Sequence, residues 1–178
     1  MAFNIMISYI KLSKTTMKTF QKLIADGLKT VPEVFPWDLQ ELMEAESSLL
    51  LLDIREPYEF DTLHIKGSMN VPRGILESAC DYGYDETVPE LARTRDKDII
   101  VICRSGNRSV LAAKTMQLMG YQSAKSLKTG VKGWNDYELP LQDIQGQTVD
   151  IDDADAILAP KVRPDQMPPK KKSTLRGY

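Results

Sequence analysis

One cysteine, Cys103, lies in a short polar loop between two apolar stretches, in the sequence VICRSGNRSVLAA at residues 101–113. The loop holds Arg104 and Arg108, which are permanent positive charges, and it contains no acidic residue. The run before Cys103 predicts a buried strand, and the run after Arg108 predicts a helix. A thiol at such a junction, beside two cations, is suited to nucleophilic chemistry on an anion.

The expected helix adds to the effect of the two arginines. A loop at the carboxyl end of a parallel strand is where open α/β sheets bind their ligands. The first N–H groups of a helix have no partner within it, and the positive end of its dipole lies behind them. Gly106 would let the chain curl so that several N–H groups converge on one anion. Together these groups favour the thiolate form of Cys103, which would then need no general base.

Other interpretations of Cys103 compete with this one. A buried, unreactive cysteine at a strand end is common, but the polar loop with two cations argues against it. A cysteine phosphatase needs five residues between the cysteine and its phosphate-gripping arginine, whereas Arg108 leaves four and Ser109 follows. The smaller cradle suits a terminal sulfur better than a phosphoryl group. A cysteine protease needs a nearby histidine, and we expect the single histidine, His64, to make a structural hydrogen bond.

Composition describes a globular chain with no strong electrostatic preference. The 178 residues are 42% hydrophobic and 27% charged, which suits one domain with tails. The net charge of -2 gives no reason to expect nucleic acid or an anionic membrane as a partner. Two cysteines form neither a disulfide framework nor a zinc-finger spacing, and no run resembles a signal peptide or is long enough to span a membrane. We therefore expect a cytoplasmic protein.

Three parts are expected along the chain. Residues 1–18 are an N-terminal extension that we expect to be disordered, and Met17 reads as well as a true start as Met1 does. Residues 19–142 are expected to form an α/β domain, a central, mostly parallel sheet flanked by helices on both faces. Residues 143–178 are acidic and then Pro-rich and basic, which predicts a flexible tail. Docking of this tail on an acidic partner or a membrane surface is the alternative.

The elements that must position Cys103 follow from hydrophobic patterning. Continuous apolar runs at 49–54 and 98–103 predict strands buried on both faces, and a weaker strand is expected at 123–127. Helices are expected around 20–28, from an N-cap at Asp38 to near Ser47, at 57–64, within 75–95, from Ser109 to Gly120 and at 130–139.

Three of these segments together resemble the single-domain rhodaneses, a family of sulfurtransferases. The sequence LLLLDIREPYEFDTLHIKGSMNVP at 49–72 resembles the family's first signature. The sequence IIVICRSGNRSVLAA at 99–113 is similar to its active-site strand, loop and helix, and MGYQSAKSLKTGVKGW at 119–134 resembles its closing segment. The resemblance covers roughly residues 33–141 and implies a rhodanese-like fold.

The function implied by the resemblance is sulfur transfer through a persulfide. Cys103 would take a sulfane sulfur from a small anionic donor such as thiosulfate and release sulfite, with no metal or other cofactor. The acceptor would be cyanide in the test tube and a thiol or sulfur-carrier protein in the cell. The loop residues whose N–H groups would cradle the persulfide are Arg104, Ser105, Gly106, Asn107 and Arg108. Structural support, through an ion pair in the first-signature turn, is implied for Asp53, Arg55 and Glu59.

This chain departs from the family's pattern at several positions. Leu63 stands where a glycine often precedes the histidine, and Thr129 stands beside Gly130 where two glycines are common. Well-known thiosulfate-using members have a second cation directly after the first loop arginine, where this chain has Ser105. This difference leaves open a physiological sulfur donor other than thiosulfate.

The remaining sequence features leave alternatives. Cys80 has acidic residues at 77, 81 and 85, which would raise its pKa, so we expect a structural role, with a resolving thiol as the alternative. Trp37 and Trp134 are expected to anchor the core. A sulfur-carrier module that acts with a protein partner, a noncatalytic interaction domain, and a cysteine-dependent phosphatase or arsenate reductase are the competing functions. Oligomeric state and pathway are not indicated by the sequence.

Overall fold

A parallel sheet forms the centre of the computed structural model, which describes residues 17–45 and 49–168. The strand order is β1-β5-β4-β2-β3, and each paired strand runs parallel to its neighbour. The strands are β1 (Glu33–Val34), β2 (Leu50–Asp53), β3 (Met69–Asn70), β4 (Ile99–Ile102) and β5 (Ala124–Leu127). Because β4 is central, Cys103 lies in the middle of the carboxyl edge of the sheet.

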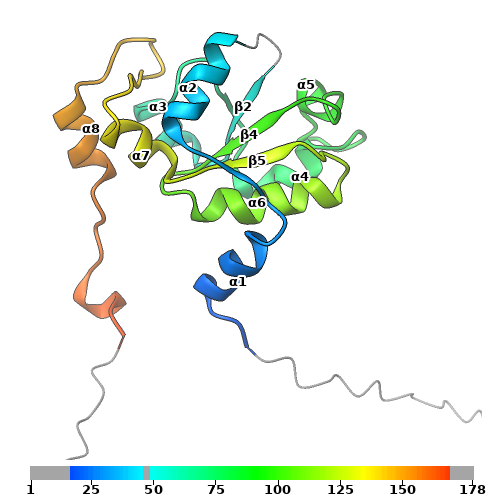
Figure 1. The fold of residues 1–178 in the computed structure, drawn as a ribbon, viewed down its shortest axis with the longest axis horizontal. Helices are drawn as coiled ribbons and strands as arrows, with labels where there is room; N and C mark the ends of the chain where they lie inside the picture. Colours follow the sequence, from blue (N-terminus) through cyan, green and yellow to red (C-terminus); the bar gives the residue numbers. More distant parts are fainter. Residues whose placement is uncertain (1–16, 46–48, 169–178) are drawn as a thin grey trace, which may run out of the picture.

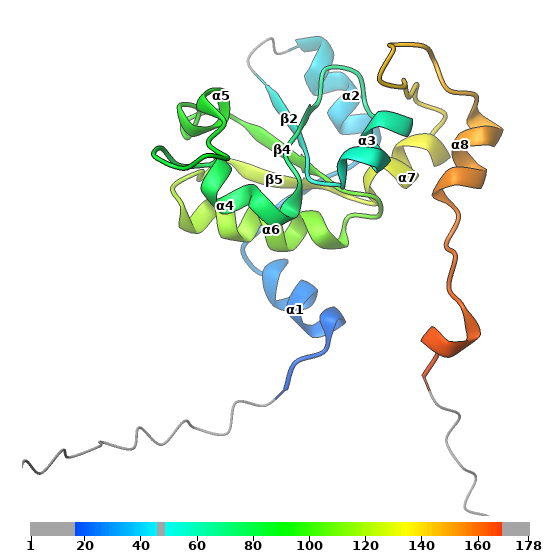
Figure 2. The same cartoon turned by 180° about the vertical axis from the view of Figure 1, so that it is seen from behind.

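Helices cover both faces of this sheet (Figure 1), as the opposite view in Figure 2 also shows. The helices are α1 (Phe20–Gly27), α2 (Pro36–Ala45), α3 (Pro57–Thr62), α4 (Leu76–Ala79), α5 (Pro89–Ala92), α6 (Asn107–Leu118), α7 (Gly130–Asp136) and α8 (Ile151–Leu158). Short 3-10 turns occupy Arg73–Ile75 and Pro164–Gln166. One face packs against α1, α4, α5 and α6, and the other against α2, α7 and α8. The expected α/β architecture is confirmed.

Strand β4 shows why a continuous apolar run predicts a central strand. Its four residues are fully buried, and successive side chains point to opposite faces of the sheet. Ile99 and Val101 belong to the core on the α6 side, whereas Ile100 and Ile102 belong to the core on the α7 side. A strand buried on both faces must be apolar at every position, and this one is.

Two predictions about α2, its first residue and the burial of Trp37, differ from the structure. The helix begins at Pro36 rather than after an N-cap at Asp38, because proline fits the first helical position and Asp38 then lies in the first turn. The helix ends at Ala45, and the predicted end near Ser47 lies outside the described residues. Trp37 is 39% exposed and stacks on Phe35 at 4.4 Å between ring centroids, so its prediction as a core anchor was wrong.

Trp134 does anchor the core. Its side chain is buried in the cluster on the α7 side of the sheet. Its indole N–H donates to the Pro140 carbonyl oxygen at 3.0 Å, which satisfies the polar atom of the buried ring.

The segment after residue 143 is more ordered than its composition predicts. Helix α8 begins after Asp150, whose side chain accepts the N–H groups of the first turn. Ala154 and Leu158 lie one turn apart and are buried in the core on the α7 side, while most of the aspartates face solvent. Asn135 of α7 donates to the Ile151 carbonyl oxygen at 3.2 Å. Residues 151–158 therefore form part of the domain rather than a flexible tail.

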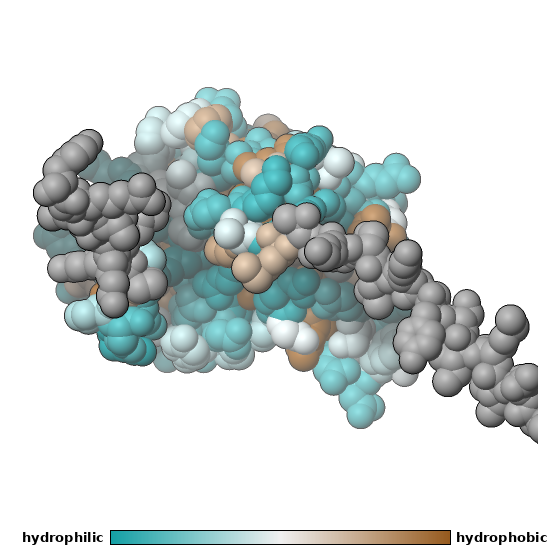
Figure 3. All heavy atoms as spheres, turned by 90° about the horizontal axis from the view of Figure 1, so that it is seen from below, coloured by the Kyte–Doolittle hydropathy of each residue, from teal (hydrophilic) through white to brown (hydrophobic). Residues whose placement is uncertain are grey.

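The face of the molecule that is seen from below is mainly hydrophilic, with hydrophobic side chains in small separate patches (Figure 3). Among residues 17–45 and 49–168, no helix combines the length and the apolar character that a membrane crossing requires.

Candidate active site

Cys103 follows β4 directly and lies just before the turn that starts α6. Gly106 has a φ of 82°, in the left-handed region, and a Cβ there would lie 2.9 Å from the Thr129 main-chain nitrogen. Only glycine fits this turn. Cys103 is 1% exposed, so its sulfur lies beneath the loop surface rather than in open solvent.

The sulfur of Cys103 contacts one residue of α6 twice. The Ser109 main-chain N–H donates to Sγ at 3.3 Å, and the Ser109 hydroxyl lies 3.3 Å from the same atom. Ser109 is fully buried, and its Oγ also lies 2.8 Å from Oγ of Ser126 on β5. Both hydroxyls face the Gly106 carbonyl oxygen, at 3.0 Å and 3.4 Å. No sequence pattern predicts a role for either serine.

This pair of hydroxyls can adapt to either state of the sulfur. A thiol can donate to the Ser109 oxygen, which leaves the Ser109 proton for the Gly106 carbonyl. A thiolate cannot donate, so the Ser109 proton must turn to it, and Ser126 then donates to Ser109 or to Gly106. The network therefore keeps its hydrogen bonds when the sulfur ionises. Ionisation of Cys103 does not leave a buried donor or acceptor without a partner.

Arg108, which the sequence analysis assigned to the anion cradle, pairs with Glu59 of α3. Its two terminal nitrogens donate to the two carboxylate oxygens at 3.2 Å and 3.3 Å. Burial by itself would raise the pKa of Glu59, but the Arg108 guanidinium brings it below its ordinary value. Burial likewise would lower the pKa of Arg108, and Glu59 raises it. The pair fixes the start of α6 against α3, so Glu59 acts on the loop as well as on its own turn.

Arg104 makes a different kind of contact. Its guanidinium donates to the main-chain carbonyl oxygen of Leu158, at 2.5 Å from Nη2 and 3.2 Å from Nε. The last residue of α8 is thereby joined to the residue next to Cys103. Because a carbonyl carries no net charge, the positive charge of Arg104 is not balanced by this contact.

Ser105 and Asn107, the other predicted loop residues, stand at the edge of the loop. Ser105 is exposed, and Asn107 is partly buried at the first position of α6. The N–H groups of Asn107 and Arg108 belong to the first helical turn and have no acceptor inside the helix. They are available to an anion that approaches the sulfur.

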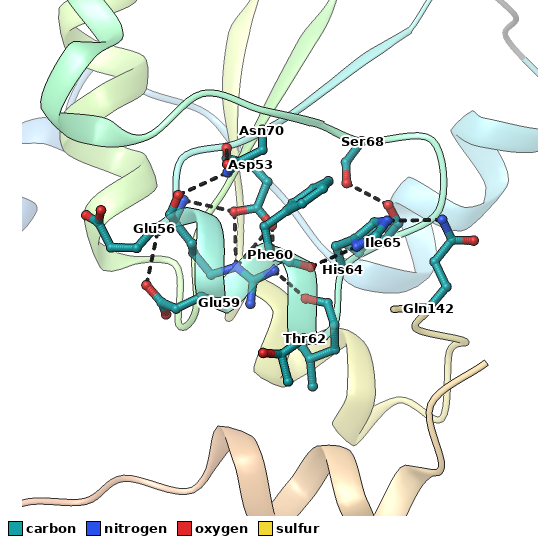
Figure 4. Close-up of polar contacts among 12 residues, drawn as sticks. Asp53, Glu56, Glu59, Phe60, Thr62, His64, Ile65, Ser68, Asn70 and Gln142 are labelled. Carbon is teal, nitrogen blue, oxygen red and sulfur yellow. Dashed lines mark hydrogen bonds and ion pairs between the residues drawn. The ribbon is translucent and has the colours of Figure 1, made fainter. Parts of the chain in front are cut away.

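Asp53 and Arg55 form a buried ion pair at the end of β2. The Arg55 Nη2 lies 2.7 Å from Asp53 Oδ2 and also donates to the Leu63 carbonyl oxygen at 2.7 Å. Asn70 lies beside Asp53 (Figure 4), and its amide donates to the main-chain oxygens of Asp53 and Arg55, both at 3.0 Å. These contacts fix the chain between β2 and α3.

His64 occupies a structural position between the Phe60 main chain and the Gln142 side chain. Its Nδ1 lies 2.9 Å from the Phe60 carbonyl oxygen and its Nε2 lies 3.0 Å from the amide nitrogen of Gln142 (Figure 4). The amide must donate to Nε2, so Nδ1 carries the proton and donates to Phe60. Both ring nitrogens are used, which leaves His64 no free nitrogen for a role at Cys103.

The closing segment after β5 packs its main chain directly on the cysteine loop. The N–H of Val131 donates to the Cys103 carbonyl oxygen and that of Lys132 to the Arg104 carbonyl oxygen, both at 2.9 Å. Gly130 has a φ of 61°, and a Cβ there would collide with the Cys103 carbonyl oxygen. Thr129 also has a left-handed φ, of 64°. The two residues at this turn therefore both take the conformation that glycine adopts most readily.

A pocket of about 290 Å³ opens between the cysteine loop, α3 and the chain after α8. Its walls are formed by Arg55, Tyr58, Glu59, Thr62, Arg104, Ile157, Leu158, Ala159 and Lys161. Arg104 is the residue after Cys103, so the pocket borders the cysteine loop. Within the described ranges no group of three or more His, Cys, Asp and Glu side chains is placed to hold a metal ion.

Cys80 lies in the core on the α6 side and is fully buried. Burial raises the pKa of its thiol, and the charges of Glu77 and Asp81 raise it further. Its carbonyl oxygen accepts the Tyr121 hydroxyl at 3.1 Å. These surroundings favour a neutral, structural thiol.

The fold and this site together define a parallel α/β protein with one cysteine, Cys103, in the loop between the central strand β4 and α6. The family model described as "Rhodanese-like domain" matches residues 36–137, and the chain belongs to this family.

Similar proteins include sulfur carriers and sulfurtransferases by name. "Putative sulfur carrier protein YrkF" of Bacillus subtilis is 28% identical over 110 residues, which are 62% of this chain and 54% of that protein. "Putative thiosulfate sulfurtransferase, mitochondrial" of Schizosaccharomyces pombe is 29% identical over 103 residues, 56% of this chain and 72% of that protein. The chain thus spans about half the length of the Bacillus relative.

A solved structure extends the likeness beyond the matched family segment. A Rhodopseudomonas palustris protein of unknown function, described as a "Possible Tyrosine Phosphatase", has a TM-score of 0.65 and 28% identity. The alignment covers 74% of this chain and 99% of that one. It supports the same fold.

Proposed function

We propose that the protein is a sulfurtransferase in which Cys103 carries the transferred sulfur as a persulfide. The single observation that carries the proposal is the position of Sγ. It lies at the start of α6, 3.3 Å from the Ser109 N–H, and so it faces the positive end of the helix. The family to which the chain belongs includes proteins named as sulfurtransferases and sulfur carriers, which agrees with this chemistry.

The proposed sulfur transfer needs no cofactor, because each bond that forms is matched by one that breaks. The Cys103 thiolate attacks the outer sulfur of thiosulfate, the S–S bond of thiosulfate breaks, and sulfite leaves with the bonding electron pair. The terminal sulfur of the persulfide is then attacked by cyanide or by a thiolate. The Cys103 thiolate leaves with the electron pair and is regenerated. No proton transfer to a base is needed when the thiolate is the resting form.

The surroundings of Cys103 support an anion on this sulfur at both steps. The N–H groups at the start of α6 and the Ser109 hydroxyl can donate to the thiolate before transfer and to the persulfide after it. Arg104 adds a positive charge at the adjacent position.

Both cysteines are free thiols, which supports a reducing, cytoplasmic location.

Intact mass of the purified protein, before and after thiosulfate, tests the proposal. We expect a gain of one sulfur atom that cyanide removes with release of thiocyanate. Cys103→Ala should gain nothing, and Cys80→Ser, the matched control at the other cysteine, should gain as the wild type does. A wild-type protein that takes no sulfur from thiosulfate or from an organic thiosulfonate would overturn the proposal.

A sulfur-carrier role with a protein acceptor is the second candidate. It is favoured by the likeness to the Bacillus relative named as a sulfur carrier. Removal of the chain beyond residue 168 leaves every described element in place. If that removal abolishes sulfur delivery to a purified carrier protein but leaves transfer to cyanide unchanged, delivery to a protein is the main role of the chain. If the shortened chain transfers sulfur to the carrier protein and to cyanide as fast as the full chain does, the small-molecule enzyme is favoured.

One observation favours the phosphatase alternative, namely the description of the Rhodopseudomonas structure as a possible tyrosine phosphatase. Against it, Arg108 is held by Glu59, and only four residues separate it from Cys103. Hydrolysis of p-nitrophenyl phosphate that depends on Cys103, in a protein that forms no persulfide, would favour the phosphatase.

A further inference from the structure

The pocket at Arg104, beside the cysteine loop, carries two positive charges that have no carboxylate partner within the described part of the chain. Arg55 is paired with Asp53, and Glu59 with Arg108. The other cations in the wall are Arg104 and Lys161, and within residues 17–45 and 49–168 neither makes an ion pair. An excess of positive charge in a concave site attracts anions and raises their local concentration.

The second of these cations comes from outside the segment that the family model matches. Lys161 follows α8, whereas the match ends at residue 137. The hydrogen bonds from Arg104 to the Leu158 carbonyl hold the end of α8 against the cysteine loop and so keep residues 157–161 at the pocket. Figure 1 and Figure 2 both show α8 beside α7, at the edge of the domain.

The same segment gives the pocket an apolar wall. Ile157, Leu158 and Ala159 line it from one side and the Tyr58 ring from α3 lines it from another. Small-molecule sites are mainly apolar with a few placed polar groups, and a volume of about 290 Å³ admits more than a bare oxyanion. The combination suits a ligand with an anionic head and a hydrocarbon body.

We propose that the pocket selects the sulfur donor and that its ligands are organic thiosulfonates, with Lys161 and Ile157 as specificity-determining residues. Lys161 and Arg104 bind the anionic head, and Ile157 contacts the hydrocarbon body. The Cys103 thiolate attacks the outer sulfur of the thiosulfonate, the S–S bond breaks, and a sulfinate leaves with the electron pair. This inference rests on the proposed function of Cys103.

Donor kinetics with two variants and two matched controls test the inference. The donors are benzenethiosulfonate and thiosulfate, and the acceptor is cyanide. Ile157→Ser should raise KM for benzenethiosulfonate by about fivefold and KM for thiosulfate much less, because only the former has a hydrocarbon body. Ile144→Ser, at an isoleucine that is also half-exposed and lies outside the pocket, should change neither.

The charge is tested at Lys161. Lys161→Glu should raise KM for both donors by about tenfold at low salt, with little change in kcat, and added salt should reduce the difference. Lys97→Glu, at another exposed lysine that lies outside the pocket, should leave KM for both donors unchanged. Equal effects of Ile157→Ser on both donors, or an unchanged KM in Lys161→Glu, would overturn the inference.

One further readout does not depend on sulfur transfer. Cys103 can be alkylated by iodoacetate, an anion, and by iodoacetamide, which is neutral, and peptide mass mapping separates it from Cys80. Lys161→Glu should lower the rate constant for iodoacetate, divided by that for iodoacetamide, by about threefold relative to the wild type. If the wild type forms no persulfide but Lys161→Glu still lowers the ratio, the proposed function is contradicted and the charged pocket is supported. A persulfide-forming protein without the change would contradict the inference alone.

Discussion

The Ser109 main-chain N–H and its hydroxyl both lie 3.3 Å from the sulfur of Cys103. One residue therefore offers two donors to the same atom. The N–H is fixed by the start of α6, whereas the hydroxyl can turn between the sulfur and the Gly106 carbonyl. Ser126 supports the hydroxyl from β5 at 2.8 Å. The strand next to β4 thus takes part in positioning the Cys103 sulfur.

Ser109→Ala should slow persulfide formation from thiosulfate by about tenfold. The substitution keeps the N–H but removes the donor that can turn toward the thiolate, and a hydrogen bond to a charged group contributes about 1.5 kcal/mol or more. Single-turnover kinetics followed by mass spectrometry measure the rate. Ser126→Ala is the control, because its hydroxyl does not contact the sulfur, and its effect should be smaller. An equal loss in the two variants would show that the hydroxyl of Ser109 has no direct role.

Thr129→Gly should stabilise the protein by about 1 kcal/mol. A β-branched residue is strained at a φ of 64°, and glycine removes that strain, although it adds entropy to the unfolded chain. Thr129 is exposed, so few packing contacts are lost. Urea unfolding measures the difference. The adjacent Gly130→Ala should do the opposite, because its Cβ would meet the Cys103 carbonyl oxygen. A loss of stability in Thr129→Gly would contradict the strain at this turn.

The Glu59–Arg108 pair should make stability depend on pH in the acid range. The folded-state pKa of Glu59 lies below its ordinary value of 4.5, so the unfolded chain binds more protons between those two values and stability rises with pH there. The contribution is complete above about pH 4.5 and is lost as the pH falls through the lower, folded-state pKa.

Glu59→Gln removes this contribution. The difference in free energy of unfolding between wild type and variant should be about 1 kcal/mol at pH 7 and should shrink below pH 4.5. Urea titrations across this range measure it, and the paired Asp26, whose pKa is also lowered, cancels because both proteins contain it. A difference that stays constant with pH would show that the pair does not titrate with folding.

Arg55→Met should be the most damaging of these substitutions, with a loss of about 3–5 kcal/mol. It leaves Asp53 charged, buried and without its partner, and it removes a donor from the Leu63 carbonyl. The double variant with Asp53→Leu should recover part of the loss, since the unpaired charge is gone. Urea unfolding of the three proteins measures this. A single variant that loses less than about 1 kcal/mol would show that Asp53 finds another partner.

The features that the sequence predicts well are those determined by neighbouring residues. Strands β2 and β4 are short apolar runs because both of their faces are buried, and the cysteine loop follows from Gly106 and the helix formers after it. The contacts that carry the site are long-range. Ser109 and Ser126 are 17 residues apart, and Arg104 and Leu158 are 54 apart. No local pattern marks either pair, so both were missed.

Helix α8 shows how composition can mislead. Its sequence is rich in aspartate, which predicts a solvated segment, but two residues one turn apart, Ala154 and Leu158, pack it against the domain. Trp37 shows the reverse case, in which a large aromatic stays partly exposed because it stacks on Phe35 at the surface.

The bond between Arg104 and the end of α8 joins two parts of the chain that lie far apart in the sequence. The reactive loop and the wall that faces it are encoded by separate stretches of the chain, residues 103–109 and 157–161. Substitutions in the second stretch can change what reaches the sulfur while the first stretch stays constant. If the pocket selects the donor as proposed, grafting residues 149–161 onto a relative should transfer the preference without altering the cysteine loop.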